Sequence, residues 1–510
     1  MNALDMLLRI TVIALGIALA PFCFASQHGV AIVIVDQTPL RPAPRETGTP
    51  HAILWQGEII EIRGERMDYV QAYDYRRERA GYIRASQVKR LSLNQADLPE
   101  LLAVIRFLRQ APGSEALGIG FASAYIQAAT AKILNSEDGI EVLDALGIFA
   151  DRLAERASAP TKLGKAARIT VAAHLEVAHR HGVKFNTHDR DGSIRMCYDG
   201  DAFRRTLALP STPEQRAIAA LSLTRLECAV DETRAVERRQ QEEWRASVLD
   251  HVEPAKLPGH LKNRIHTRRA AVWATLAYQR TRGGLQMGES ADAEAAEQRA
   301  LAELAGINKQ ELADDDLVAY RDAAMRVNAS RWAAGGTAAP QSHGTGPREK
   351  NRPRIVTVSG EPGETCIHVI DAKTDTDRPL VKRCTYGIAW VGSATVNREG
   401  TAIALAVQSA EAWRELWVFS RMDNDWTVRV MPPAATAPGV GYAEFAGWRP
   451  GGAQMLVARE AVGEGKYLRS FELVRVDTLA PIRQASDTDL IDAFKRWQDP
   501  QWKQQTVSLR

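Results

Sequence analysis

The stretch "YDYRRERAGYIRASQVKRL", residues 73–91, follows "GEIIEIRGERMDYVQ" and completes a series of short alternating segments near the start of the chain. Apolar and polar residues alternate within several of these segments, and turn-forming residues separate them, which is the pattern of short β-strands. Five such strands within residues 28–91 predict a small, closed or half-closed β-barrel.

Three motifs in this region occur in an order that is typical of a known family. They are Leu-Arg-x-x-Pro at residues 40–44, Gly57-Glu58 before a strand, and Gly81-Tyr82-Ile83. Together they resemble the bacterial SH3 domain of exported envelope proteins, which binds wall peptides or protein partners through loops and aromatic surfaces. The resemblance implies an SH3-like barrel with a set of ligand-binding aromatic residues: Trp55, Tyr69, Tyr73, Tyr75 and Tyr82. For Tyr69 and Tyr82 the alternative is a place in the barrel core, because inward-facing side chains fill small barrels.

Residues 1–25 have the layout of a secretory signal peptide. "MNALDMLLR" ends in one positive charge, an apolar run follows, and Cys23 and Ala25 are small residues suited to cleavage before Ser26. The apolar run is short for a membrane span and Pro21 interrupts it, so we expect cleavage and no stable membrane insertion afterwards. An uncleaved membrane anchor is the alternative. The mature protein is expected to be periplasmic or secreted.

The length of the chain limits the number of its domains, and its charge limits the kinds of partner that it can bind. Its 510 residues suffice for about three domains of ordinary size. The formal net charge is only +3, with no basic stripe of the kind that nucleic-acid binding requires. A nucleic-acid partner is therefore not expected.

Four cysteines remain once Cys23 leaves with the signal peptide. An even number in an oxidising compartment predicts two disulfides, for which three connectivities are possible. Proximity in the sequence favours pairing within each of two couples, Cys197 with Cys228 and Cys366 with Cys384. The second bridge would tie the two strands of a hairpin.

Residues 92–336 show a helical period and predict an all-α domain. The clearest start is "STPEQ", in which Thr212 is the expected cap, Pro213 the first helical residue and Gln215 the partner in a capping box. Elsewhere in this domain, "HLEVAHRHGVKFNTHDRDG" concentrates histidines and carboxylates. A zinc-protease helix places two histidines four residues apart, whereas His174 and His179 are five apart, about 140° around the helix.

Two interpretations of this histidine cluster follow. The favoured one is the end of a helix and a hairpin turn between "VKFNTH" and "SIRMCYD", with no metal and no cofactor. The alternative is a metal site that uses His174, His179 and His188.

The C-terminal part of the chain is predicted to be rich in β-strands. A linker at 337–354 precedes strands over 355–485, and residues 486–510 are expected to form a short amphipathic helix on that sheet and a tail. "NREGTAIALAVQ" and "RPGGAQMLVARE" align at Gly400 and Gly452, which indicates an internal repeat of several strands.

One segment of this β-rich part, "GWRPGGAQMLVA", resembles the Trp-x-Pro-Asp-Gly repeat of TolB-like β-propellers, with Gly451 where aspartate is usual. The resemblance implies a propeller-like domain. About three units fit in the available length, fewer than a closed propeller needs, so an open stack of antiparallel sheets or a ring completed by another chain are both possible.

The whole chain is therefore predicted to be a multidomain α+β protein with an SH3-like barrel, an all-α middle domain and a propeller-like or antiparallel β-domain. The favoured function is that of an exported bacterial envelope protein with a binding or scaffolding role, whose ligand is a cell-wall peptide or a periplasmic protein. No complete catalytic motif is present, so no catalytic residue is predicted. The alternative is a metal-dependent hydrolase that acts on the cell wall through the cluster between His174 and His188.

Overall fold

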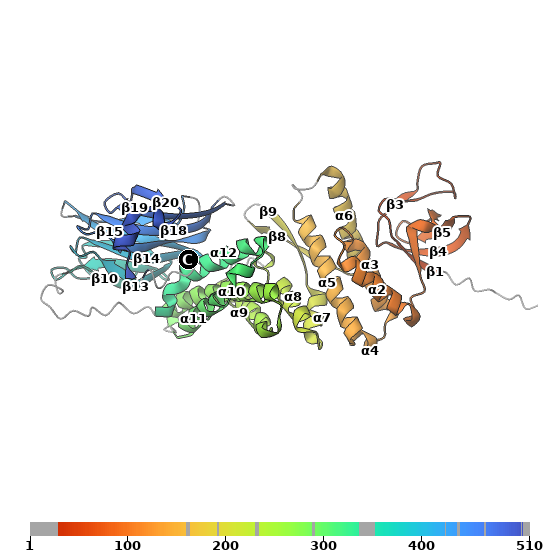
Figure 1. Cartoon of the computed structure of the whole chain (residues 1–510), viewed down its shortest axis with the longest axis horizontal. Helices are drawn as coiled ribbons and strands as arrows, with labels where there is room; N and C mark the ends of the chain where they lie inside the picture. Colours follow the sequence, from red (N-terminus) through yellow and green to blue (C-terminus); the bar gives the residue numbers. More distant parts are fainter. Residues whose placement is uncertain are drawn as a thin grey trace, which may run out of the picture. The chain divides into compact units, whose positions relative to one another are not determined.

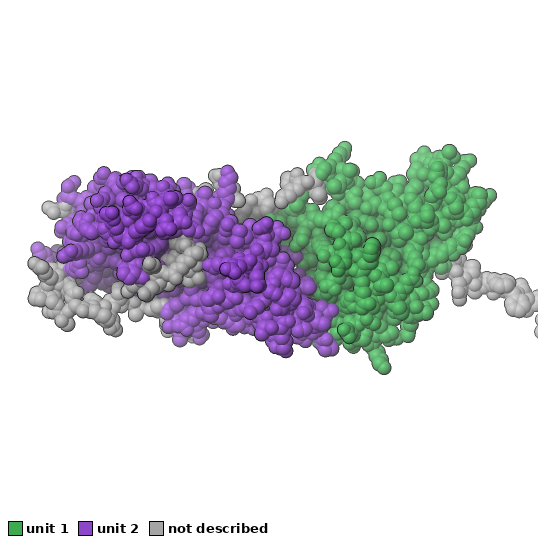
Figure 2. All heavy atoms as spheres, in the orientation of Figure 1, with its two compact units in different colours: residues 1–209 green, residues 210–510 purple. Residues whose placement is uncertain are grey.

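The computed structural model describes residues 29–159, 164–190, 193–229, 234–287, 291–335, 352–423, 425–435, 439–463, 466–500 and 502. The predicted signal peptide and residues 337–351 of the predicted linker lie outside these ranges. The fold is mixed α+β, as predicted (Figure 1). Contacts divide the chain into two compact units, residues 1–209 and 210–510 (Figure 2). This boundary falls inside the range 92–336 that was expected to form one helical domain.

The first unit begins with a five-stranded antiparallel sheet in the order β6-β5-β4-β1-β7. Its strands are β1 (Gly29–Val33), β4 (Ile59–Arg66), β5 (Tyr69–Asp74), β6 (Arg79–Arg84) and β7 (Val88–Leu91). A two-stranded hairpin of β2 (Thr38–Leu40) and β3 (Ala52–Leu54) lies between β1 and β4 in sequence. The end strands β6 and β7 do not pair with each other, so the strands described here form no closed barrel.

The two faces of this sheet have different neighbours, because successive side chains of a strand point to opposite faces. One face forms a small core with the β2–β3 hairpin, built by residues such as Val33, Ile60 and Val70. On the other face, Ile32 of β1 and Leu91 of β7 join the core of the helices. Helices therefore cover this second face at β1 and β7.

In the described residues of the first unit, six α-helices and a hairpin follow the sheet. The helices are α2 (Leu98–Arg109), α3 (Glu115–Ala128), α4 (Ala131–Leu134), α5 (Glu137–Ala157), α6 (Lys165–Arg180) and α7 (Asp201–Ala208). Strands β8 (Phe185–Arg190) and β9 (Ser193–Tyr198) pair antiparallel, which confirms the hairpin predicted after the histidine-rich helix. The helical core centres on the apolar face of α5, with Phe149 and Leu153 fully buried.

The second unit combines helices and sheets around shared cores. Its helices are α8 (Pro213–Leu223), α9 (Ala235–Asp250), α10 (Gly259–Met287), α11 (Ala291–Ala305) and α12 (Asp314–Ser330), followed by the 3₁₀ turn η7 (Arg331–Gly335). Leu276 of α10 belongs to the same buried cluster as Ile388, Trp390 and Ala406 of the sheet. The helices of this unit and the strands that follow them are thus packed as one body.

The strands in the described part of the second unit form two sheets that contain three antiparallel layers. The first layer is β10 (Arg354–Ser359), β11 (Thr365–Ile370) and β12 (Val381–Thr385). The second is β13 (Ile388–Val396), β14 (Ala402–Ala410), β15 (Trp413–Met422) and β16 (Asp425–Met431). The third is β17 (Val440–Trp448), β18 (Gln454–Gly463), β19 (Lys466–Arg475) and β20 (Pro481–Ala485).

These layers stack on one another through apolar faces. One cluster joins β10–β11 to β13–β15, and a second joins β14–β15 to β17–β18. The second and third layers are also linked at one edge, where β15 and β17 are parallel over two residue pairs, Trp413 with Gly441 and Arg414 with Tyr442. The short helix α13 (Asp492–Trp497) packs Phe494 against Phe471 of β19, as the amphipathic pattern predicted.

The predicted disulfides are confirmed. Cys366 of β11 and Cys384 of β12 lie opposite each other in the ladder and are bonded. Cys197 and Cys228 are disulfide-bonded as well. Among the helices in the described part of the chain, none combines the length and hydropathy that crossing a membrane requires.

Candidate ligand-binding site

A groove of about 820 Å³ lies in the first unit, where β1, β4 and β7 of its sheet meet helix α2. This volume lies within the range of sites that bind small molecules and short peptides. The groove is lined by residues of β1, β4 and β7 and by the first turns of α2, among them Val30, Ile62, Arg63, Glu65, Lys89, Arg90, Asp97, Glu100 and Leu101.

The groove lies beside the first residues of β1, Gly29 and Val30, so side chains from both faces of the sheet line it. At Ile32 and Leu91 the helices pack directly on the sheet, whereas the same face further along β4 carries the exposed side chain of Arg63. Strand β4 is irregular at this point, because its register against β5 shifts between Ile62 and Gly64. Such bulges redirect side chains, and here the irregularity places Arg63 at the wall of the groove.

Four charged residues that line the groove form ion pairs with each other, and Arg63 pairs with Glu61 of the same strand, outside the lining. Lys89 Nζ lies 2.5 Å from Glu100 Oε1, and Arg90 pairs with Glu65. Arg63 Nη2 lies 3.1 Å from Glu61 Oε2. The four partners in the first two pairs are all well exposed, and exposed pairs contribute only about 0–1 kcal/mol. A ligand with charges of both signs can therefore replace these pairs at little cost.

Asp97 also lines the groove, at the start of α2. Its carboxylate accepts hydrogen bonds from Ser92 Oγ at 2.5 Å and from Ser92 N at 2.9 Å. These bonds, from the side chain first and the backbone second, lower the pKa of Asp97. Asp97 therefore remains ionised over the whole physiological pH range.

Two of the predicted aromatic residues meet beside the groove, and Arg63 connects them to it. The guanidinium carbon of Arg63 lies 3.6 Å from the centroid of the Tyr73 ring and 6.0 Å from that of Tyr75. The two rings pack edge to face with centroids 4.9 Å apart. Tyr75 is 68% exposed, and a hydrogen bond to Glu61 raises the pKa of its phenol. We call Arg63, Tyr73 and Tyr75 the aromatic cluster.

The other three predicted aromatic residues lie elsewhere in the first unit. Tyr69 is buried, with the guanidinium of Arg84 5.7 Å from its ring. Tyr82 is half-buried on β6, and its backbone exchanges two hydrogen bonds with Arg41. Trp55 packs edge-on against the imidazole of His174, with centroids 6.4 Å apart.

The structure separates the three histidines of the alternative metal site. His174 is buried and its Nε2 lies 2.9 Å from Asp36 Oδ1 and 3.3 Å from Gln56 Nε2. His179 is exposed at the end of α6, and His188 lies on β8. Within the described ranges these three side chains do not converge on one point that could hold a metal.

The contact between His174 and Asp36 has an electrostatic consequence. Burial raises the pKa of Asp36, but the hydrogen bond and the charge of His174 outweigh burial, and the pKa lies below its ordinary value. Asp36 therefore stays charged and holds His174 in place, which favours a structural role for this histidine.

A cluster of Glu364, Cys366 and Cys384 has the spacing of metal ligands. Both cysteines are joined in a disulfide, however, and a metal needs a free thiolate. This cluster is therefore part of the β11–β12 hairpin and not a metal site.

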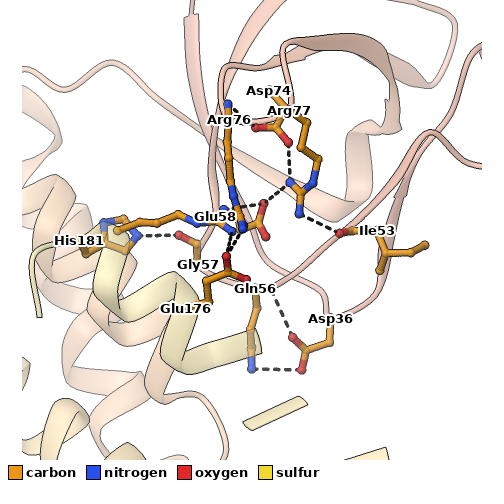
Figure 3. Close-up of polar contacts among 11 residues, drawn as sticks. Asp36, Ile53, Gln56, Gly57, Glu58, Asp74, Arg76, Arg77, Glu176 and His181 are labelled. Carbon is orange, nitrogen blue, oxygen red and sulfur yellow. Dashed lines mark hydrogen bonds and ion pairs between the residues drawn. The ribbon is translucent and has the colours of Figure 1, made fainter. Parts of the chain in front are cut away.

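A polar network holds the sheet of the first unit on helix α6 (Figure 3). The carboxylate of Glu58, 3% exposed, lies 3.3 Å from Arg77 Nη1 and 3.3 Å from Nη1 of Arg180 on α6. Arg76 forms a second link to α6 through Glu176. Burial raises the pKa of Glu58, and Arg77 opposes that effect. The network fixes the sheet on its helices, and with it the wall of the groove.

Backbone contacts reinforce this attachment. Nε2 of His181 lies 2.8 Å from the carbonyl oxygen of Gly57. Gly57 has φ of +88°, and a Cβ at this position would lie 2.3 Å from the carbonyl oxygen of Ala116 on α3. Only glycine permits so close an approach between the loop before β4 and this helix.

The charged residues of the groove were not identified from the sequence. The alternation of Glu61 and Arg63 with Ile60 and Ile62 shows that these charges share a face of β4. That Lys89 lies on the same groove depends on the β1–β7 pairing and on the place of α2, which strand alternation alone does not fix.

Comparison of the chain with protein-family models, with curated proteins and with solved structures finds no match. The geometry of the groove is therefore the basis for assigning a function.

Proposed function

We propose that this is an exported bacterial envelope protein with a binding or scaffolding role, and that the groove of its first unit binds a cell-wall peptide. The observation that carries the proposal is a peptide-sized groove with charges of both signs and an aromatic cluster at its wall. The five-stranded antiparallel sheet within residues 29–91 supports the resemblance to an SH3-like binding module. The disulfides support export, because such bonds persist in oxidising compartments.

The chemistry of the groove suits a short zwitterionic peptide. Cell-wall peptides carry free carboxylates and amino groups within a few residues of each other. A ligand carboxylate would accept hydrogen bonds from the guanidinium group of Arg63 or Arg90, since arginine binds carboxylates through two parallel hydrogen bonds. A ligand ammonium would replace a cation beside Glu65 or Glu100. Tyr75 would cover the aliphatic part of the peptide from the side.

The test is calorimetric titration of the full-length mature protein with purified soluble wall peptides. We expect Arg63→Glu to weaken binding about tenfold or more, because the loss of one charge-assisted hydrogen bond costs roughly 1.5–3 kcal/mol. Tyr75→Ala should weaken binding less. Arg475→Ala removes an exposed ion pair with Asp477 in the second unit and serves as the control, with unchanged affinity.

Two results would contradict the proposal. Equal affinities of the wild type and Arg63→Glu would place the ligand elsewhere on the protein. If the wild type binds no wall peptide but retains a periplasmic protein in a manner that depends on Arg63, the ligand is a protein and the function is scaffolding.

A further inference from the structure

The sheet of the first unit has a gap in line with β1. Within the described ranges β1 begins at Gly29, which pairs with Ile62 of β4. Strand β4 continues beyond Ile62 to Arg66, and among the described strands this part of it has a neighbour, β5, on one side only. The edge of β4 that faces away from β5 is therefore open beyond Ile62.

The groove occupies this gap. Gly64 and Glu65 line it on the side of β4, and Leu91 and Ser92 line it at the end of β7. Because β1 lies between β4 and β7 in the sheet, the space between these two walls has the place of a further length of β1. We call this space the strand gap.

The hydrogen bonds of β6 show which backbone groups of β4 point into the strand gap. Successive residues of a strand direct their N–H and C=O groups to opposite sides. Tyr82 of β6 exchanges two backbone hydrogen bonds with Arg41, on the side away from β5. Its neighbour Ile83 therefore bonds to β5, where it lies opposite Val70. The N–H and C=O groups of Val70 are thus directed to β6.

The same alternation continues from β5 to β4. The next residue of β5, Gln71, directs its backbone groups to β4, where it lies opposite Gly64, and Tyr69 does the same opposite Arg66. Glu65 stands between these two bonded positions, so its N–H and C=O point away from β5 and into the strand gap. Within the described residues neither group has a hydrogen-bond partner. An open donor and acceptor at a strand edge are the groups to which an extended peptide adds as a further strand.

Side chains on the two faces of the sheet set the surroundings of such a strand. Arg90 lies opposite Ala31 of the small core, and its ion pair with Glu65 lies at the strand gap on that face. On the other face the gap is lined by Leu101 and Val104 of α2. Successive side chains of a strand point to opposite faces, so polar and apolar side chains alternate in a ligand that matches these surroundings.

We propose that the peptide ligand of the groove lies extended in the strand gap, antiparallel to β4, and exchanges two hydrogen bonds with the backbone of Glu65. The inference rests on the peptide-binding role proposed above and narrows the class of ligand. The ligand is a linear peptide in which the residue opposite Glu65 has an unsubstituted backbone N–H. Its main chain gives affinity and its alternating side chains give specificity, as in other proteins that bind peptides at the edge of a sheet.

The test is a calorimetric titration of the full-length mature protein with a wall peptide and with analogues that each carry one N-methylated amide. Methylation of the amide that donates to Glu65 removes a hydrogen bond and leaves the carbonyl of Glu65 without its donor, and we expect binding to weaken about tenfold. Methylation of the next amide should have little effect, because that N–H points away from β4. Equal effects at every amide, or none at any, would overturn the proposal and leave the peptide-binding role intact.

Two variants of Glu65 test the same hydrogen bonds from the side of the protein. Glu65→Pro removes the backbone N–H, which β5 does not use, and an open strand edge tolerates proline at such a position. Glu65→Ala removes the same carboxylate but keeps the N–H, so it is the matched control. We expect Glu65→Pro to bind the peptide roughly fivefold or more weakly than Glu65→Ala does. Equal affinities of the two variants would overturn the proposal, and if Glu65→Pro does not fold, the N-methylated peptides decide.

A deletion tests whether the chain's own N-terminal residues compete with the ligand. Residues 26–28 precede β1 and lie outside the described ranges. A variant without them should bind the wall peptide as tightly as the wild type does. Binding that occurs only in this variant would show that the strand gap is closed to ligands in the wild type, and would overturn the proposal. Absence of binding by both proteins would contradict the peptide-binding role itself.

Discussion

Individual residues decide how closely the sheet of the first unit approaches its helices. Gly57 has a left-handed backbone conformation, and a carbonyl oxygen of helix α3 lies close to the position that a Cβ would occupy. Gly48 has a similar φ of +107°, but nothing lies within 4 Å of the position of its missing Cβ. A substitution at Gly48 therefore tests the backbone conformation alone, whereas a substitution at Gly57 tests the conformation and the close packing together.

Gly57→Ala should destabilise the first unit more than Gly48→Ala. The left-handed conformation costs an alanine about 1–2 kcal/mol at either position. At Gly57 the clash with Ala116 adds roughly 1–3 kcal/mol, since a side chain forced into a packed site displaces its neighbours. Thermal unfolding followed by circular dichroism measures the difference, and equal melting temperatures would contradict the close approach.

Asp144 gives the first unit a pH dependence. Burial raises the pKa of this carboxyl to about 6, although Arg109 Nη2 lies 2.6 Å from Oδ2 and opposes the shift. Because the folded state holds the proton more tightly than the unfolded state, the contribution of Asp144 to stability is greatest at low pH. It declines as the pH rises from about 4 to about 6, by on the order of 3 kcal/mol.

Asp144→Asn should remove this decline. The comparison is of the free energies of unfolding of wild type and variant at a series of pH values between 4 and 7. The free energy of unfolding of the variant minus that of the wild type should increase as the pH rises. A difference that is constant with pH would show that Asp144 titrates normally.

At the scale of single elements, the sequence predicted well wherever the determining contacts are local. Thr212 caps α8, and Gln215 completes the capping box with its own side chain, as predicted. Cys366 and Cys384 were expected to bridge a hairpin and lie opposite each other in the ladder. Both features depend on residues close in sequence, whose geometry is fixed by the turn or hairpin between them.

The bridge between Cys366 and Cys384 should stabilise the second unit. It closes a loop of 18 residues, for which the chain-entropy estimate is about 3 kcal/mol. Replacement of both cysteines by serine should lower the melting temperature of the second unit and leave that of the first unit unchanged. A fall of equal size in both units would contradict this.

At the scale of the whole molecule, long-range packing decides the organisation, and strand or helix periodicity does not reveal it. Nothing local to Ile388, Trp390 or Ala406 indicates that these strand residues pack against Leu276, more than a hundred positions earlier. The groove has the same origin, because it lies between strands and a helix that meet only in the folded unit. The types of element were predictable, and their partners were not.

Trp390→Ala should therefore loosen helices as well as strands. Trp390 is 1% exposed, and truncation of a buried tryptophan costs roughly 3–5 kcal/mol. Hydrogen exchange followed by mass spectrometry should show faster exchange in α10 as well as in β13 and β14. Tyr386→Ala, at a position that is 50% exposed, is the control. Unchanged protection of α10 would mean that the helices and the sheet are energetically independent.

The layered strands of the second unit also bear on how such a chain can evolve. Gly400 and Gly452 stand before the second strand of two successive four-stranded layers, and their φ values of +68° and +67° are nearly identical. Each layer meets its neighbour through an apolar face, and the edge link between two of them is only two residue pairs long. Gene duplication can add such a layer, whereas deletion of one exposes the apolar face that it covered on its neighbour. We expect the lengths of homologous chains to differ here in steps of one whole layer.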